Sequence, residues 1–210
     1  MSYIAMYTRF ASTKGGVPMR KVTFGGANSL DNFIARKNHE VDWLIWNKEV
    51  EAISRAFWQT IDTVVMGRKT YDVAAKAGSG AYPGVKNYVF SRTLKKSSHR
   101  RVQIISEDAA EFVGRLKQEQ GKGICVIGGG VLARSLFEAQ LIDEIGFNIH
   151  PVLLGSGIPL FYEMSRQINL ELLECKTLNN GCVVVRYKVI PDIRSQISDL
   201  KIETFGTTPI

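Results

Sequence analysis

Two glycine-bearing junctions hold the residues of this sequence that could bind an anion. In CVIGGGVLARSL (125–136) an apolar run meets three consecutive glycines and then a helical pattern, and in VVMGRKTYD (64–72) Gly67 stands at a similar boundary. A helix N-terminus exposes unpaired N–H groups that attract phosphate, and glycine lets the backbone approach the anion without a Cβ in the way. The cationic and hydroxyl side chains beside Gly67 are Arg68, Lys69 and Thr70. Either junction alone is a weak signal, but the two at one sheet edge could hold a pyrophosphate-bridged ligand.

A third junction offers a clamp for one further phosphate. Ser91 and Arg92 follow directly on the strand-like run NYVF. The forked guanidinium of arginine suits phosphate, and the hydroxyl adds another donor. The alternative is an ordinary exposed turn. Together with Arg68, the pair favours a pocket for an additional phosphate such as the 2′-phosphate of NADP.

The glycine triplet also invites comparison with the dinucleotide-binding pattern G-x-G-x-x-G/A. Gly128, Gly130 and Ala133 match its letters. That pattern belongs to the first strand–helix unit of its fold, and an acidic residue follows about twenty residues later at the end of the next strand. Here a long series of predicted elements precedes the glycines, and Asp143 and Glu144 stand too early, at the start of the next strand. The triplet therefore does not mark a Rossmann domain.

The elements that would position these junctions alternate along residues 20–190. Periodicity predicts four helices, at residues 47–58, 68–77, 106–118 and 131–139. It predicts strands at residues 20–28, 63–67, 85–91, 101–106, 168–178 and 182–190. Two further strands are predicted, one within residues 123–130 and one that begins at residue 141. Asn47 and Ser106 are the predicted caps of the first and third helices, and residues 29–43 are predicted to be a polar loop. We therefore expect an α/β fold with a central, mostly parallel sheet, helices on both faces, and an antiparallel C-terminal hairpin.

Length and composition fit one domain with appendages. The chain has 210 residues, and the predicted organisation is an N-terminal extension at 1–18, one domain at 19–190 and a polar tail at 191–210. An apolar run of about eighteen residues, which a spanning helix would need, is not found, and the N-terminus is a poor secretory signal. We therefore expect a cytoplasmic protein without a membrane partner.

Cysteine and tryptophan side chains have ordinary structural explanations. Cys125 lies in an apolar run and is predicted to be core, while Cys175 and Cys182 are not expected to face one another in a disulfide. The cysteines have no metal-ligand spacing, so we expect no metal site. Trp43 and Trp46 could wall a ring-binding pocket, or they could pack into the core.

The chain is basic, which favours anionic ligands. Its formal net charge is +7 and its pI is about 9.4. The densest basic run, KKSSHRR (95–101), has no interleaved aromatic residues and no helical stripe, so a solvated loop is the simpler interpretation. Phosphorylated small molecules remain the anions that best suit the three junctions, and no nucleic-acid partner is expected.

An ordered set of motifs carries a family resemblance over about residues 20–190. The motifs are SLDNFIA, VVMGRKTYD, YPGVKNYVFSR, VIGGGVLARSLF, LIDEI and HPVLLGSGIPLF. In this order the chain resembles the dihydrofolate reductase-like superfamily, in particular the reductase domain of bifunctional riboflavin-biosynthesis deaminase-reductases and its stand-alone relatives. These motifs are typical of the superfamily and do not specify one substrate.

The resemblance implies NADPH as hydride donor and assigns roles to individual residues. Ala27 and Ile34 would border the nicotinamide half. Phosphates would be held by Gly67, Arg68, Lys69 and Thr70, and the 2′-phosphate by Ser91 and Arg92. The segment passing under the pyrophosphate and nicotinamide would be Ile127, Gly128, Gly129, Gly130, Val131 and Leu132, with a strained Gly-Gly peptide near Gly129–Gly130.

Departures from the family pattern bear on the substrate and the proton donor. True dihydrofolate reductases have an arginine where this chain has Val85, and an aromatic residue where it has Ala133, so folate reduction is not expected. The riboflavin branch has glycine where this chain has Asn32. Asp42 is the nearest candidate for the acid, and ordered water is another candidate source of the proton. Asp31 could serve as acid or bind substrate hydroxyls, or it could simply cap its turn.

The resulting functional hypothesis is an NADPH-dependent reductase acting on a small molecule. Hydride would pass to a C=N or C=O carbon, with 5-amino-6-(5-phosphoribosylamino)uracil or a related compound as candidate substrate. The alternatives are an NADP-binding module with reduced catalysis, a true dihydrofolate reductase, and a nucleic-acid binder using residues 95–101. The sheet edge left by the C-terminal hairpin would suit a homodimer.

Overall fold

The computed structural model describes residues 19–78 and 80–191. The predicted extension at 1–18 and, apart from Pro191, the predicted tail at 191–210 lie outside the described residues. Within the described part, no helix is both long enough and apolar enough to cross a membrane.

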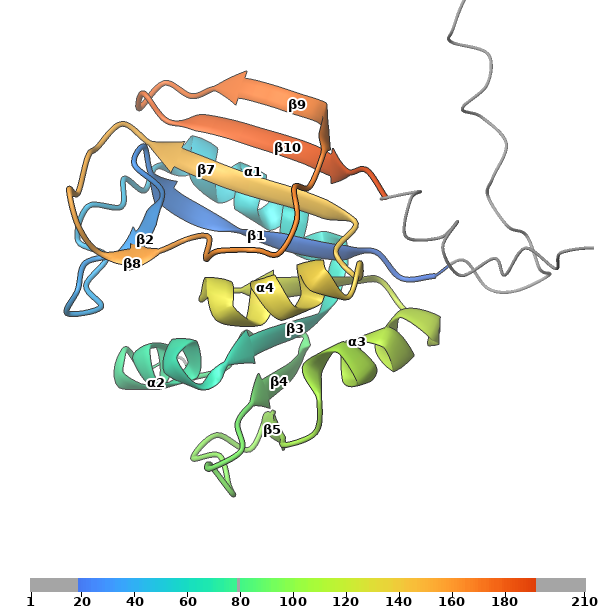
Figure 1. The fold of residues 1–210 in the computed structure, drawn as a ribbon. Coiled ribbons are helices and arrows are strands. Elements are labelled where there is room, and N and C mark those ends of the chain that lie inside the picture. Colours follow the sequence, from blue (N-terminus) through green and yellow to red (C-terminus); the bar gives the residue numbers. More distant parts are fainter. Residues whose placement is uncertain (1–18, 79, 192–210) are drawn as a thin grey trace, which may run out of the picture.

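The described chain is organised around one sheet of eight strands (Figure 1). Its spatial order is β5-β4-β3-β6-β1-β7-β10-β9. The strands are β1 (Val22–Ser29), β3 (Ile61–Gly67), β4 (Lys86–Phe90), β5 (Val102–Ile105), β6 (Gly123–Ile127), β7 (Glu144–His150), β9 (Leu170–Thr177) and β10 (Val183–Val189). The strands from β5 to β7 in this order run parallel, and the hairpin of β10 and β9 adds two antiparallel strands at the β7 edge. The predicted fold class is confirmed.

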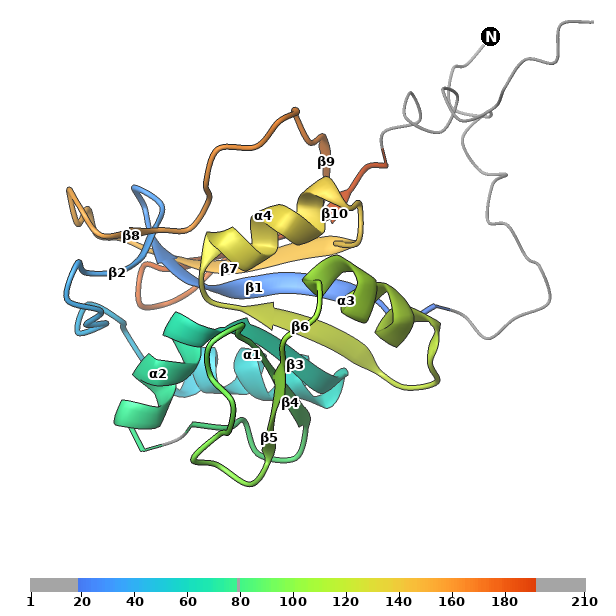
Figure 2. The same ribbon diagram turned by 60° about the horizontal axis from the view of Figure 1, so that its bottom comes forward.

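In the part of the chain that the structure describes, four helices cover the two faces of the sheet. They are α1 (Lys48–Gln59), α2 (Arg68–Lys76), α3 (Ala109–Gln118) and α4 (Gly130–Glu138). The chain first moves outward from β1 to β5 and then returns to β6 and β7. Because parallel crossovers keep one hand, the outward helices α1 and α2 cover one face and the returning helices α3 and α4 cover the other (Figure 2).

The core lies between the sheet and these helices. Phe24 of β1 is fully buried and meets Phe137 and Phe147 edge to face. On the other face, Met66 of β3 is fully buried in a cluster with Tyr71 of α2. Both faces of the central strands are therefore apolar, as expected for strands covered by helices on each side.

Local cap chemistry explains where the helices begin. Asn47 Oδ1 accepts a hydrogen bond from Val50 N at 2.9 Å, so the predicted cap of α1 is confirmed. The prediction of Ser106 as the cap of α3 is wrong, because Asp108 Oδ1 accepts from the backbone N–H groups of Ala110 at 2.8 Å and of Glu111 at 3.1 Å. An acidic cap is also favoured by the helix dipole.

Two short strands were not expected from the sequence. β2 (Phe33–Ala35) and β8 (Ile158–Pro159) pair antiparallel beside the main sheet. The segment predicted to be a polar loop therefore contains a strand. Such short strands give little periodicity, and their pairing depends on two segments far apart in the chain.

The cysteines behave as predicted. Cys125, Cys175 and Cys182 are free. Cys175 pairs across the hairpin with Val185, so it does not face Cys182. Burial raises the pKa of the Cys125 thiol to about 12, which keeps it protonated as a core residue.

Candidate active site

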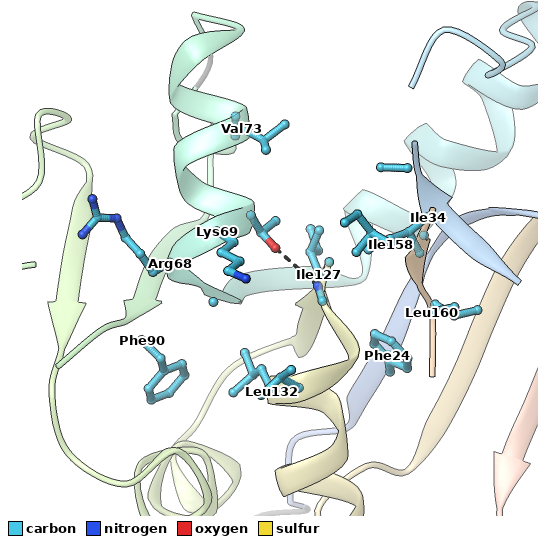
Figure 3. Close-up of a pocket in the computed structure, with 18 of the residues that line it drawn as sticks. Phe24, Ile34, Arg68, Lys69, Val73, Phe90, Ile127, Leu132, Ile158 and Leu160 are labelled. Atoms are coloured by element: carbon cyan, nitrogen blue, oxygen red, sulfur yellow. Dashed lines mark hydrogen bonds between the residues drawn. The ribbon is translucent and has the colours of Figure 1, made fainter. Parts of the chain in front are cut away.

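A cavity of about 1000 Å³ opens at the carboxyl ends of the parallel strands (Figure 3). Residues of β1, β3, β4, β5 and β6 reach it, as do the first turns of α2 and α4. Ligands of open α/β sheets bind at this edge, because the strand ends and helix N-termini converge there. The volume is at the upper end of small-molecule sites, which suits a dinucleotide together with a small substrate.

The start of α2 forms one wall of the cavity. Gly67, the last residue of β3, is also the N-cap residue of α2, and a Cβ built on it would meet nothing within 4 Å. The N–H groups of this helix end are therefore approachable. Arg68 points away from α4, with Nε 2.7 Å from Asp72 Oδ1, whereas Lys69 points toward α4 (Figure 3).

The start of α4 forms the facing wall, and Thr70 connects the two. Gly129 N donates a hydrogen bond to Thr70 Oγ1 at 3.3 Å, shown as a dashed line in Figure 3. Gly128 has a φ of 81°, and a Cβ there would lie 2.1 Å from Thr70 Oγ1. Gly129 has a φ of −55°, and a Cβ there would meet nothing within 4 Å. Gly128 is thus the residue with a left-handed backbone conformation, and it lies one position before the Gly129–Gly130 peptide that is expected to be strained.

The ends of β4 and β5 form a polar wall beside α2. Ser91 Oγ accepts from Leu94 N at 2.9 Å, so it stabilises the turn, while its own hydroxyl proton stays available for donation. Arg92 next to it is exposed. Glu107 and Asp108 line the same part of the cavity, and Asp108 is also the cap of α3.

The structure brings most of the predicted cofactor residues together. Those that line the cavity are Ala27, Ile34, Gly67, Arg68, Lys69, Thr70, Ser91, Arg92, Ile127, Gly128, Gly129, Val131 and Leu132. Gly130 is buried behind this wall instead, because a Cβ on it would lie 2.4 Å from the carbonyl oxygen of Leu160. The role of these residues in cofactor binding stays a prediction.

Neither predicted catalytic carboxylate is among the residues that line this cavity. Asp31 accepts hydrogen bonds from Gly155 N at 2.7 Å and Leu154 N at 3.2 Å, and from Ser29 Oγ at 2.5 Å. The Ser29 hydroxyl and these N–H groups lower the pKa of Asp31. Asp31 is therefore an anion that holds the segment after β7 in place. This agrees with the alternative in which Asp31 has a structural role and not a catalytic one.

Asp42 is held in an ion pair at the surface. Arg36 Nε lies 2.7 Å from Asp42 Oδ1, and Arg36 Nη2 lies 3.2 Å from Oδ2. The hydrogen bonds from Arg36 lower the pKa of Asp42. A carboxylate with a lowered pKa is a poor proton donor near neutral pH, so this arrangement does not favour Asp42 as the acid.

His39 and Tyr82 are among the titratable side chains on the cavity that sequence reasoning missed. His39, with a left-handed φ of 71°, reaches the cavity from the segment after β2. Tyr82 stacks on Trp58 with ring centroids 5.1 Å apart, and burial raises the pKa of its phenol, which stays protonated. Tyr82 opens the motif YPGVKNYVFSR, but nothing in that motif indicates a role for the phenol, and His39 lies outside the motifs. Only the folding of separate segments onto one cavity reveals them.

Trp43 and Trp46, which could wall a ring-binding pocket or pack into the core, do not line the cavity. Trp43 is buried and meets His150 edge to face, with ring centroids 5.2 Å apart, so its core alternative is the one observed. Trp46 is 65% exposed and joins neither the core nor the cavity.

The comparisons with known proteins agree with this geometry. Residues 20–184 match the family model described as RibD C-terminal domain. YyaP of Bacillus subtilis (strain 168) is 33% identical over 180 residues, which cover 80% of this chain and 94% of YyaP. The crystal structure of a putative riboflavin biosynthesis protein from Shewanella sp. PV-4 superposes with a TM-score of 0.72 at 25% identity, covering 81% of this chain and 99% of that one.

A more distant structure shows that the fold itself is dihydrofolate reductase-like. Dihydrofolate reductase from Enterococcus faecalis, complexed with NADP(H) and RAB-propyl, has a TM-score of 0.59 at 16% identity, covering 81% of this chain and 97% of that one. The family match runs from β1 to the start of β10 and includes every junction that borders the cavity. This chain is therefore a member of the RibD C-terminal domain family.

Proposed function

We propose that the protein is an NADPH-dependent reductase that transfers a hydride to a C=O or C=N carbon of a small molecule. The observation that carries this proposal is the meeting of two helix N-termini, α2 and α4, across one cavity, joined by the Thr70–Gly129 hydrogen bond. Membership of the RibD C-terminal domain family supports an oxidoreductase of this class. The fold likeness to a dihydrofolate reductase complexed with NADP(H) is consistent with the cofactor.

The residues present fit this cofactor. Gly67 and Gly129 leave space where a Cβ would point, so a pyrophosphate can approach both helix starts. Lys69 is placed to neutralise it, and Ser91 with Arg92 would hold a 2′-phosphate at the neighbouring strand end. When bound, NADPH supplies the hydride.

The protein's own contribution is positioning and the control of water and protons. Ala27 and Ile34 line the cavity near β1 and β2, where an apolar surface would orient a planar ring and exclude water. A proton must reach the reduced carbonyl or imine. Asp31 and Asp42 are engaged elsewhere as anions, so we propose that this proton comes from Tyr82, His39 or solvent.

Cofactor titration tests the proposal directly. Adding NADPH should raise the thermal unfolding temperature and change nicotinamide fluorescence, and NADH should bind more weakly because it lacks the phosphate that Arg92 would meet. The absence of any response at millimolar NADPH would refute the reductase function.

A second candidate is a module that binds NADP without catalysing a reaction. The observation in its favour is that both predicted acids, Asp31 and Asp42, are held away from the cavity by other partners. Tight NADPH binding combined with no oxidation of NADPH by any carbonyl or imine compound would support this alternative.

We also propose that two copies of the chain pair through the edge strand β9. All eight residues of β9 are exposed, and its leucines Leu170, Leu172 and Leu173 are 42%, 56% and 44% exposed. An unpaired strand edge with apolar side chains is a ready partner for a second copy. Nucleic acid remains unexpected as a partner. The basic segment 95–101 is tethered by Tyr71, whose hydroxyl lies 2.8 Å from Ser97 Oγ and 2.9 Å from Ser98 Oγ.

A further inference from the structure

The cavity has two parts of opposite character. The charged part lies around the starts of α2, α3 and α4 and the end of β4, and its ionised side chains are Arg68, Lys69, Arg92, Arg134, Glu107 and Asp108. The other part lies between α2 and the β2–β8 pair. Figure 3 shows Val73, Ile34 and Ile158 on this side, away from Arg68. We refer to these two parts as the charged half and the apolar half.

The apolar half is lined mostly by aliphatic side chains. From the segments that hold Ile34, Val73 and Ile158, the residues that line the cavity are Ile34, Ala35, His39, Val41, Leu44, Val73, Ala74, Ala77 and Ile158. Among these described residues there is neither an arginine nor a lysine. Val41 and Leu44 keep 43% and 38% of their surface exposed at the cavity, although both are large and apolar. Exposed apolar surface gathered in a concave site is typical of a binding surface for an apolar group.

The segment that brings His39 and Val41 to this half carries balanced charge. The segment RKNHEVD (36–42) carries Arg36 and Lys37 against Glu40 and Asp42, which is two positive and two negative charges. Arg36 is already bound by both oxygens of Asp42. A phosphate group buried in the apolar half would therefore lose its hydration without gaining a described guanidinium or ammonium partner, which is strongly unfavourable.

The cations of the cavity lie in the charged half, and most of them have a partner or a proposed one. Lys69 points toward the start of α4, where the cofactor's pyrophosphate would lie (Figure 3). Arg92 stands beside Ser91 at the proposed 2′-phosphate position. Arg68 is paired with Asp72, and Arg134 lines the cavity from α4. The net charge of the chain therefore does not by itself indicate a phosphorylated substrate.

We propose that the substrate is an uncharged, mainly apolar carbonyl or imine compound, and not a phosphorylated sugar. This rests on the proposed reductase function. In the reaction the hydride, with its two electrons, passes from NADPH to the carbon of C=O or C=N, and one proton from Tyr82, His39 or solvent passes to the oxygen or nitrogen. The products are an alcohol or amine and NADP⁺.

A matched pair of ketones tests the charge preference. 4-Nitroacetophenone and 4-acetylbenzoate have nearly the same shape, but only the second is an anion, and methyl 4-acetylbenzoate restores neutrality. Calorimetric titration into the protein saturated with NADP⁺ should give a Kd at least about tenfold lower for the two neutral ketones than for the anion, because an unpaired charge is costly to bury. D-Ribose 5-phosphate should not compete with either neutral ketone.

A charge placed in the apolar half provides a gain-of-binding test. Val41→Arg changes a residue with 43% of its surface exposed, so the core is left intact. This variant should bind 4-acetylbenzoate up to about fivefold more tightly, the upper range for a partly exposed ion pair. Val41→Gln, of similar size but uncharged, is the matched control and should leave the preference for neutral ketones unchanged.

The outcomes separate the substrate class from the reductase function. A lower Kd for neutral ketones, with the difference narrowed by Val41→Arg and not by Val41→Gln, supports the proposal. If NADP⁺ binds but 4-acetylbenzoate or ribose 5-phosphate binds better than 4-nitroacetophenone, or if the neutral ketone does not bind at all, the substrate class is wrong and the cofactor assignment stands. If NADP⁺ itself fails to bind, the reductase function and the substrate class both fall.

Discussion

Alanine at Gly128 and at Gly129 should damage the protein in two different ways. Gly128 has a left-handed φ of 81°, which costs an L-residue about 1–2 kcal/mol. The new methyl group would lie 2.1 Å from Thr70 Oγ1 and 2.5 Å from Thr70 Cγ2, so the strand end or α2 must shift at a cost of about 1–3 kcal/mol. Gly128→Ala should therefore lower the unfolding free energy by about 2–5 kcal/mol.

Gly129→Ala should leave the stability of the fold intact and weaken the binding of NADPH. Its φ of −55° suits alanine, and the methyl group meets nothing within 4 Å, so the unfolding free energy should stay the same or rise by up to about 1 kcal/mol. The methyl group would, however, stand where the pyrophosphate must approach the start of α4. Losing one charge-assisted hydrogen bond there should raise the Kd for NADPH at least about tenfold.

Denaturant unfolding followed by fluorescence measures the first effect, and NADPH titration of the folded variants measures the second. Thr70→Ala removes the two closest atoms but leaves Thr70 Cβ at 2.8 Å, so in a double variant it should recover part of the stability lost in Gly128→Ala. Equal destabilisation by the two alanines would refute the packing argument. An unchanged Kd for NADPH in Gly129→Ala would refute the proposed path of the pyrophosphate.

Three further predictions concern sites outside this junction. Arg92→Gln should raise the Kd for NADPH about tenfold and leave that for NADH unchanged, as measured by paired titrations, because only NADPH has the 2′-phosphate. Leu172→Lys on the exposed β9 edge should convert a dimer into a monomer in sedimentation analysis without altering the circular dichroism spectrum. Burial lowers the pKa of His150 below its ordinary 6.5, so the unfolded state binds its proton first and the unfolding free energy should fall as the pH drops below about 6.5. His150→Gln should flatten this slope, and an unchanged slope would show that another group is responsible.

Features that depend on neighbouring residues could be predicted from the sequence. The cap at Asn47 needs only the backbone N–H of Val50, three residues later, and alternation of apolar residues is enough to place strands and helices. The error at Ser106 also has a local cause, because Ser106 and Asp108 both carry acceptor side chains and it is Asp108 that caps the helix. The mostly parallel sheet followed from the alternation of strands and helices.

Features that depend on residues far apart could not be predicted in this way. Asp31 could be an acid or a cap by sequence alone, and its contact with Gly155, 124 positions away, shows it bound to backbone N–H groups. The distinct constraints on Gly128 and Gly129 likewise depend on Thr70, which belongs to another helix.

By itself the sequence determined the order of the elements, the glycine junctions and the basic side chains beside them, since hydrophobic periodicity and backbone freedom are properties of short segments. Only the tertiary structure decided that Val41 and Val73 face one cavity with Tyr82, and that Asp31 and Asp42 do not. The physical reason is that burial, charge pairing and the boundary between an apolar and a charged half arise when distant segments pack together. The net charge is a sum over the whole chain, whereas a bound ligand contacts only the residues that line its cavity.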